Sequence, residues 1–218
     1  MPQIFPRSAN SIARASIIGL LVAIGGFLLV LDVFNRSSWQ TNQEVVIQQP
    51  VQFSHARHVA GNGIDCRYCH TSVEESHFAG IPPVETCMSC HSQVLADADI
   101  LQPVRTSYET GAPLEWTRVH DLGDFVYFDH SIHVNSGVGC VTCHGPVDEM
   151  ALTWQHSTLQ MQWCLDCHRD PGQYLRPQEH VFDIDWTYDG DQTTLGDSLV
   201  EAYGIKVEQL TNCSICHR

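Results

Sequence analysis

The chain is poor in positive charge. Of its 218 residues, 11 are lysine or arginine and 25 are aspartate or glutamate, so the formal net charge is −14. A surface with this balance repels phosphate groups, which argues against nucleic acid and anionic lipid as partners. There is a single lysine, Lys206.

Regular hydrophobic periodicity is also scarce. After residue 35 few stretches follow the period of a helix, and the strand signal is weak. Too little of this region is periodic to build an ordinary protein core. The one helix expected in the C-terminal part lies around Leu195 to Tyr203.

No cysteine stands outside a repeated motif. The chain has 10 cysteines, and every one belongs to a C-x-x-C-H unit. The five units are Cys66-Cys69-His70, Cys87-Cys90-His91, Cys140-Cys143-His144, Cys164-Cys167-His168 and Cys213-Cys216-His217.

C-x-x-C-H is the attachment site of c-type haem. On one helical turn the two thiols and the histidine share a face, so the thiols form thioethers and the histidine supplies one axial nitrogen. Zinc and disulfides are the alternative interpretations. A zinc ribbon does not require a histidine after each cysteine pair. A disulfide framework would not repeat one local spacing five times. The sequence therefore predicts five covalently bound haem c groups.

A low-spin haem also needs a ligand on its other face. Eight of the 13 histidines lie outside the motifs. Four of them form two matching stretches, FSHARHV at residues 53–59 and FDHSIHV at residues 128–134. In each stretch two histidines lie one turn apart and can point toward two different haems. These four are expected to be distal ligands: His55, His58, His130 and His133.

The fifth distal ligand is less clearly marked. His120 is favoured because it shortly precedes the second stretch. The competitors are His77, His156, His180, Met150 and Met161. Met161 lies three residues before Cys164, a spacing at which methionine more often packs against a haem edge.

The N-terminal region holds one candidate membrane segment. Residues 15–31 contain no charge, at the lower limit of the roughly 17–25 residues that a spanning helix needs. No small-x-small cleavage site follows, so we expect an uncleaved anchor. Arg7 and Arg14 precede it and only Arg36 lies close behind. The positive-inside rule then puts the N-terminus in the cytoplasm and the haem region in the periplasm.

Two similar modules follow the anchor, which indicates an internal duplication. We expect a mostly irregular chain with short α-helices, in which the haems themselves form the core of a multihaem cytochrome c. The predicted segments are 1–14 (cytoplasmic N-terminal segment), 15–34 (transmembrane anchor), 35–52 (linker), 53–92 (first dihaem module), 93–127 (connector), 128–169 (second dihaem module) and 170–218 (C-terminal segment with the fifth haem).

The modules resemble the class III multihaem cytochromes c, in which both histidines of the F-x-H-x-x-H stretch bind iron. A closer resemblance covers nearly the whole chain. The stretches PQIFPRSANSIARAS, CRYCHTSVEESHFAGIPPVETCMSCH, VHDLGDFVYFDHSIHV, MQWCLDCHRDP and TNCSICHR look like the pentahaem cytochrome subunit of alternative complex III, a bacterial membrane complex that oxidises quinol.

This resemblance implies an inner-membrane electron-transfer subunit that is not an enzyme by itself. Its partners would be an iron–sulfur subunit related to molybdopterin enzymes, integral membrane subunits that bind quinol, and a monohaem cytochrome c. The alternative function is a self-sufficient multihaem quinol dehydrogenase feeding a periplasmic reductase. Such a protein would need a proton acceptor beside a haem near the membrane, and Asp32 at the end of the anchor is the candidate.

Overall fold

The computed structural model describes residues 4–217, so the first three residues of the segment predicted over 1–14 and the last residue of the segment 170–218 lie outside it. The chain divides into two units, Met1–Gln43 and Glu44–Arg218, which are described separately. The predicted boundary between anchor and linker, at residue 34, stays a prediction.

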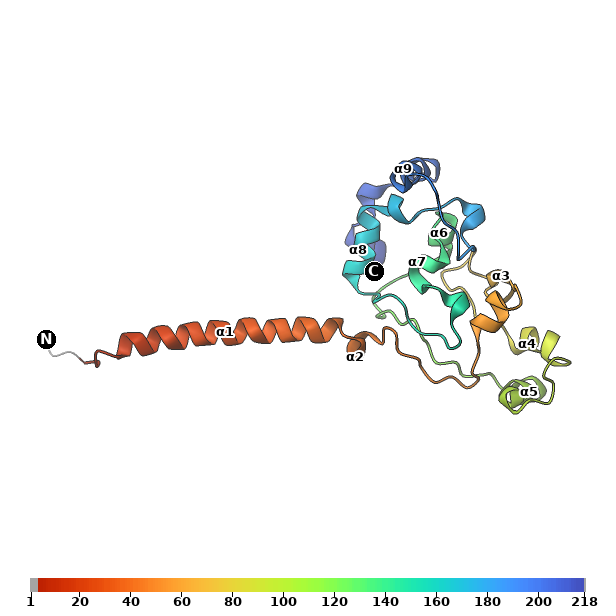
Figure 1. Ribbon diagram of the computed structural model, residues 1–218, viewed down its shortest axis with the longest axis horizontal. Helices are drawn as coiled ribbons and strands as arrows, with labels where there is room; N and C mark the ends of the chain where they lie inside the picture. Colours follow the sequence, from red (N-terminus) through yellow and green to blue (C-terminus); the bar gives the residue numbers. More distant parts are fainter. Residues whose placement is uncertain (1–3, 218) are drawn as a thin grey trace. The chain divides into compact units, whose positions relative to one another are not determined.

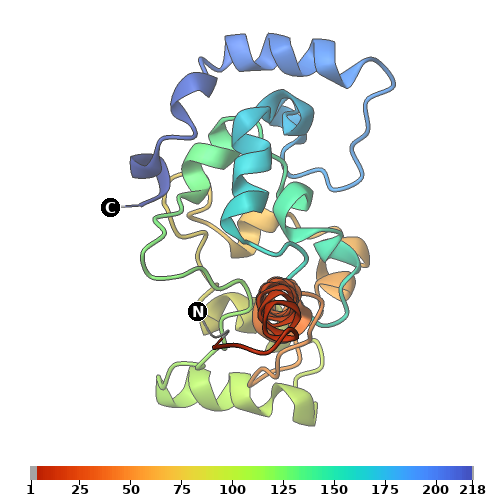
Figure 2. The same ribbon diagram turned by 90° about the vertical axis from the view of Figure 1, so that its left-hand side faces the viewer.

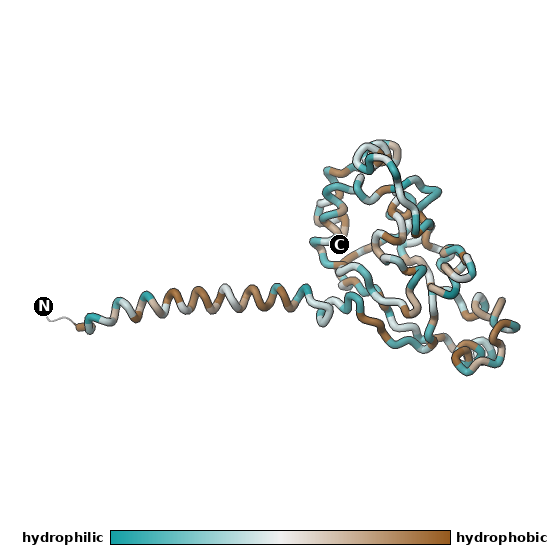
Figure 3. The backbone as a smooth tube through the Cα atoms, in the orientation of Figure 1, coloured by the Kyte–Doolittle hydropathy of each residue, from teal (hydrophilic) through white to brown (hydrophobic). Residues whose placement is uncertain are grey.

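The first unit is dominated by one long apolar helix, α1 (Ala9–Arg36), followed by α2 (Ser38–Thr41). Its 28 residues rise about 42 Å, more than the roughly 30 Å hydrocarbon core of a bilayer. Its length and composition allow it to cross a membrane, and Figure 3 shows the apolar residues concentrated along it. The side chain of Asp32 forms an exposed ion pair with Arg36 at 2.9 Å.

The second unit consists of short helices joined by long irregular segments (Figures 1 and 2). Between residues 4 and 217 there is no β-strand beyond three isolated antiparallel bridges. Its helices are η1 (Ala56–Ala60), α3 (Cys66–Cys69), α4 (Val84–His91), η2 (Asp99–Leu101), α5 (Gln102–Thr110), α6 (His130–Asn135), α7 (Cys140–His144), η3 (Val147–Glu149), α8 (Met161–Arg169), η4 (Pro171–Tyr174), η5 (Gln178–His180), α9 (Gln192–Ala202), η6 (Val207–Gln209) and α10 (Cys213–Cys216).

Local side chains start several of these helices. Asp65 accepts a hydrogen bond from the Arg67 N–H and begins α3, and Asp129 does the same for Ile132 in α6. The helix expected around Leu195 to Tyr203 is present as α9. It begins three residues earlier because the Asp191 carboxylate accepts from the N–H groups of Thr193 and Thr194.

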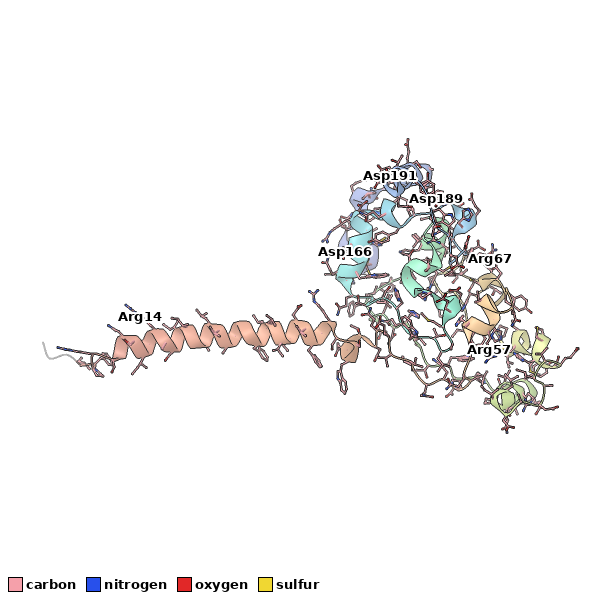
Figure 4. All side chains as sticks on the ribbon, viewed as in Figure 1. Arg14, Arg57, Arg67, Asp166, Asp189 and Asp191 are labelled. Atoms are coloured by element: carbon pink, nitrogen blue, oxygen red, sulfur yellow. The ribbon has the colours of Figure 1, made fainter. Side chains whose placement is uncertain are left out.

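The apolar core of the second unit is small. One cluster joins the buried residues Val51, Leu101 and Val104, and a second joins Val73, Val134 and Val181. Met150 and Leu175 are also buried, whereas many other apolar side chains of this unit are exposed, as expected for a chain with little periodic apolar sequence. Labelled charged side chains, including Arg57, Arg67 and Asp166, lie at the surface (Figure 4). The cysteines and histidines of the motifs are mostly half-buried.

Candidate haem-binding sites

The five C-x-x-C-H motifs lie on five separate short helices, α3, α4, α7, α8 and α10. Each helix holds its two cysteines one turn apart, with the histidine at or just beyond its end. Within residues 4–217 no three metal-binding side chains are arranged to hold one metal ion among them. Two thiols and one imidazole per helix fit a haem held by two thioethers.

The histidines present the nitrogen that iron needs. A carbonyl oxygen can only accept a hydrogen bond, so a histidine Nδ1 bonded to one carries the proton and leaves the lone pair on Nε2. Such a bond also fixes the ring, as it does in many metal sites. The bonds run from Nδ1 of His70 to Gly80 O (2.7 Å), His91 to Val94 O (2.9 Å), His168 to Leu210 O (3.0 Å), His217 to Phe125 O (3.1 Å), His58 to Ser54 O (2.8 Å), His133 to Asp129 O (2.7 Å) and His130 to His77 O (2.9 Å).

Three histidine pairs have the separation expected for two imidazoles on one metal ion. Metal–imidazole bonds are about 2.0 Å long, and adding the distance from each nitrogen to its ring centre separates the two centroids by about 6.3 Å. The observed centroid distances are 6.1 Å for His58 and His91, 6.1 Å for His133 and His168, and 6.4 Å for His130 and His144. The first two pairs occupy equivalent positions in the two modules.

The first module has the same pair of positions as the pair His130 and His144 of the second. These positions are occupied by His55, the first histidine of its stretch, and His70, the histidine of the first motif. Burial lowers the pKa of His55 to about 4, and the neighbouring His70 ring adds to this shift. His55 is therefore neutral near pH 7 and lies close to the histidine of the first motif.

The phenylalanine that leads each F-x-H-x-x-H stretch orients both histidines. Phe53 meets His55 edge-on at 4.9 Å and stacks on His58 at 4.4 Å. Phe128 meets His130 edge-on at 4.8 Å and stacks on His133 at 4.6 Å. The first stretch folds as a π-helical turn and the second as an α-helix, yet the rings take the same arrangement. The spacing in the sequence singles out these phenylalanines, but it does not predict that they orient the two histidine rings.

The first and third motifs meet at their leading cysteines. The Cys66 and Cys140 thiols lie within hydrogen-bonding distance of each other. This bond and burial together raise the pKa of the Cys140 thiol. Cys66 and Cys140, which would each hold one haem through a thioether, are therefore neighbours.

Contacts also join the other motifs in pairs. The Tyr68 hydroxyl on α3 lies 3.0 Å from the Ser89 hydroxyl on α4, which connects the first motif to the second. Burial raises the pKa of Cys143 to about 12, with a further contribution from the nearby Cys167 and Cys164 thiols. The third motif therefore adjoins the fourth.

The fourth motif adjoins the fifth. His168 of the fourth motif donates to the carbonyl oxygen of Leu210, three residues before Cys213. Burial raises the pKa of Cys164, and the nearby Cys216 thiol contributes. Helix α6 also links the third and fourth motifs, because one of its two histidines faces each of them, one turn apart.

The fifth motif lies against the segment that precedes α6. The N–H of Tyr127 donates to Cys216 O at 2.8 Å, and the Phe125 and His217 rings are 5.8 Å apart. His120, favoured from the sequence as the fifth distal ligand without being assigned to one haem, lies beside His144, with ring centroids 4.4 Å apart. The fifth distal ligand stays a prediction.

The other candidates for this ligand are distributed over the second unit. His77 is exposed, and its carbonyl oxygen accepts from His130. His156 packs against Gly145, and His180 stacks on Trp186 at 5.7 Å. Met150 is buried, whereas Met161 is 67% exposed at the start of α8.

Comparisons with known families agree with this geometry. Residues 126–218 match the family of cytochrome c7 and related cytochromes c, and residues 32–113 match the class III cytochrome c family. The first match contains three of the motifs and the second contains two. The predicted fold class, a mostly irregular multihaem cytochrome c with short helices and one N-terminal apolar helix, is confirmed.

One curated relative is the multihaem cytochrome c subunit of a menaquinone reductase from Nitratidesulfovibrio vulgaris. The two chains are 37% identical over 98 residues, which is 44% of this chain and 46% of the relative. The chain thus aligns with about half the length of this relative.

The number of bound groups is directly measurable. Five complete motifs that together contain all ten cysteines predict five thioether-bound haems and no remaining thiol in the native chain. Intact mass and a pyridine haemochrome assay should both give five haems per chain. Four haems, or any cysteine that a thiol reagent modifies in the loaded protein, would contradict this count.

Proposed function

We propose that this chain is a membrane-anchored electron-relay subunit that holds five haems in a single row. Each bound haem supplies reversible one-electron chemistry at its iron. The chain holds the attachment sites in the order second, first, third, fourth and fifth motif. The observation that carries this proposal is the set of pairwise contacts between consecutive sites, together with three histidine pairs at the spacing of a shared metal ion.

Both ends of the row lie at the surface of the second unit. Cys90 of the second motif is exposed, and Val94 and Leu95 beside it are 58% and 62% exposed. At the fifth motif Cys213 is exposed, and the neighbouring Phe125 is 67% exposed. Redox partners can therefore approach the terminal sites, whereas the Cys140 and Cys143 thiols in the middle of the row are half-buried.

The coordination supports transfer of electrons rather than bond chemistry at iron. A catalytic haem keeps one axial position open for its substrate. In this chain a distal histidine faces the motif histidine in three pairs, and His55 lies close to the first motif histidine. Four of the five sites thus have a histidine near the motif histidine, and the fifth takes its distal ligand from the remaining candidates. With all these positions filled, the chain is an electron-transfer subunit and not an enzyme by itself.

The sequence resemblance supports a place in alternative complex III. In that setting the chain would receive electrons from quinol-oxidising membrane subunits and deliver them to periplasmic acceptors or a terminal oxidase. Its partners would include the iron–sulfur subunit and the monohaem cytochrome c. The apolar helix α1 supports a single-pass inner-membrane anchor with a cytoplasmic N-terminus and a periplasmic haem domain.

A second candidate function runs in the opposite direction. The curated relative belongs to a menaquinone reductase, so a related role here would deliver electrons to menaquinone. Electrons can pass along the row of sites in either direction, and the partner subunits determine which direction is used. In both cases the chain relays electrons for a quinone site on another subunit, since one helix cannot form the walls of a pocket.

The relay proposal is tested by comparing the chain with and without its partners. Reconstituted alone in lipid, the chain should be reduced by dithionite and only slowly by menaquinol analogues. In the native complex, exchange of electrons with menaquinol should be fast and sensitive to quinone-site inhibitors. Fast, inhibitor-sensitive quinol oxidation by the isolated chain would contradict the relay and favour the self-sufficient dehydrogenase, for which Asp32 at the end of the anchor is the candidate proton acceptor.

A further inference from the structure

The histidine of the third motif differs from the other four in its hydrogen bond. In the first, second, fourth and fifth motifs the histidine Nδ1 contacts a backbone carbonyl oxygen. In the third motif Nδ1 of His144 contacts a side chain instead, the Nε2 of His120, at 3.2 Å. The two rings are nearly perpendicular, with an interplanar angle of 75°.

A hydrogen bond between these two nitrogens needs one proton, which belongs either to Nδ1 of His144 or to Nε2 of His120. Only the first choice leaves the lone pair of His144 on Nε2, where a metal ligand of this motif needs it.

This proton position determines what His120 can do. Its Nε2 lone pair accepts the hydrogen bond from His144 and is therefore not available to iron. The distal side of the third site already has His130, whose ring lies 6.4 Å from that of His144 and nearly parallel to it, at 9°. Three histidines thus meet at one site, and two of them suffice for the axial positions.

We propose that His120 is a positioning residue for the third haem site, acting as the hydrogen-bond acceptor of the His144 ligand rather than as the fifth distal ligand. This inference rests on the proposed function, because it assumes a haem bound at the third motif. An imidazole acceptor on Nδ1–H increases the electron density of the ligand, which favours the oxidised state of the bound metal. His120 therefore lowers the redox potential of the third site.

Two variants of the full haem-loaded chain separate this role from the alternatives. His120→Gln keeps an acceptor oxygen, whereas His120→Leu removes it. We expect all haems to stay low-spin in both variants by electron paramagnetic resonance, with no carbon monoxide binding. A redox titration should show an upward shift of one midpoint potential in the leucine variant and a potential close to the wild-type value in the glutamine variant. Asp121→Asn, an exposed change in the same segment, is the matched control and should shift nothing.

Each other outcome overturns the inference. A high-spin, carbon monoxide-binding haem in both variants would show that His120 is itself a ligand. Unchanged potentials in the leucine variant would show that the contact has only a structural role. The wild-type chain tests the proposed function separately, since fewer than five haems or an open iron there would contradict the relay before any variant is considered.

Discussion

Replacing His58 or His133 by leucine is expected to open one iron in a chain that otherwise binds no carbon monoxide. Each histidine lies 6.1 Å, centroid to centroid, from a motif histidine on another helix, the spacing of two imidazoles on one metal ion. Leucine keeps a similar volume but has no donor atom. One of the five haems should become high-spin, and the reduced protein should bind one equivalent of carbon monoxide, measured by difference spectroscopy.

Matched controls lie on the same turns. Arg57→Gln and Ile132→Ser change exposed neighbours of the two histidines and should leave all five haems low-spin. A low-spin spectrum in both leucine variants would contradict the pairing of the second histidine of each stretch with the second haem of its module. Carbon monoxide binding by the unmodified chain would instead contradict the closed coordination and reopen an enzymatic function.

Removing the third attachment site should divide the row into two halves. In the double variant Cys140→Ser with Cys143→Ser, four haems remain, two on each side of the gap. Because the third site adjoins both the first and the fourth, its haem would connect the two halves. After mixing the membrane complex with a menaquinol analogue, two haems should be reduced quickly and two slowly, whichever end exchanges electrons with the quinone site.

The control removes a terminal site instead. Cys87→Ser with Cys90→Ser also leaves four haems, but they form one uninterrupted row, so their reduction should follow a single phase. The haem count in both variants is checked by the pyridine haemochrome assay before the kinetics. A single phase in the third-site variant would show that the sites branch and would contradict the proposed order.

Much of this site could be predicted from the sequence because its chemistry is local. A C-x-x-C-H unit contains three of the groups that hold one haem within five residues, so the five attachment sites need no knowledge of the fold. The paired histidines were recognisable for the same reason, since their three-residue spacing is itself a helical turn. The irregular fold followed from the scarcity of periodic apolar sequence.

What the sequence left open depends on contacts between distant segments. The pairing of distal with motif histidines joins residues such as His58 and His91, whose separation carries no local signal. The position of His120 is of the same kind. It was favoured as the fifth ligand because it lies near the second module in sequence, whereas the fold puts its ring against His144.

The order of the sites is the central claim and can be measured directly. A cryo-electron microscopy map of the native, haem-loaded complex would locate five irons in this chain and show which are neighbours. We predict a single row in the order of the second, first, third, fourth and fifth motif, with His58, His130 and His133 on the irons of the second, third and fourth motifs. A branched arrangement, a different order or an iron without a distal ligand would contradict the account.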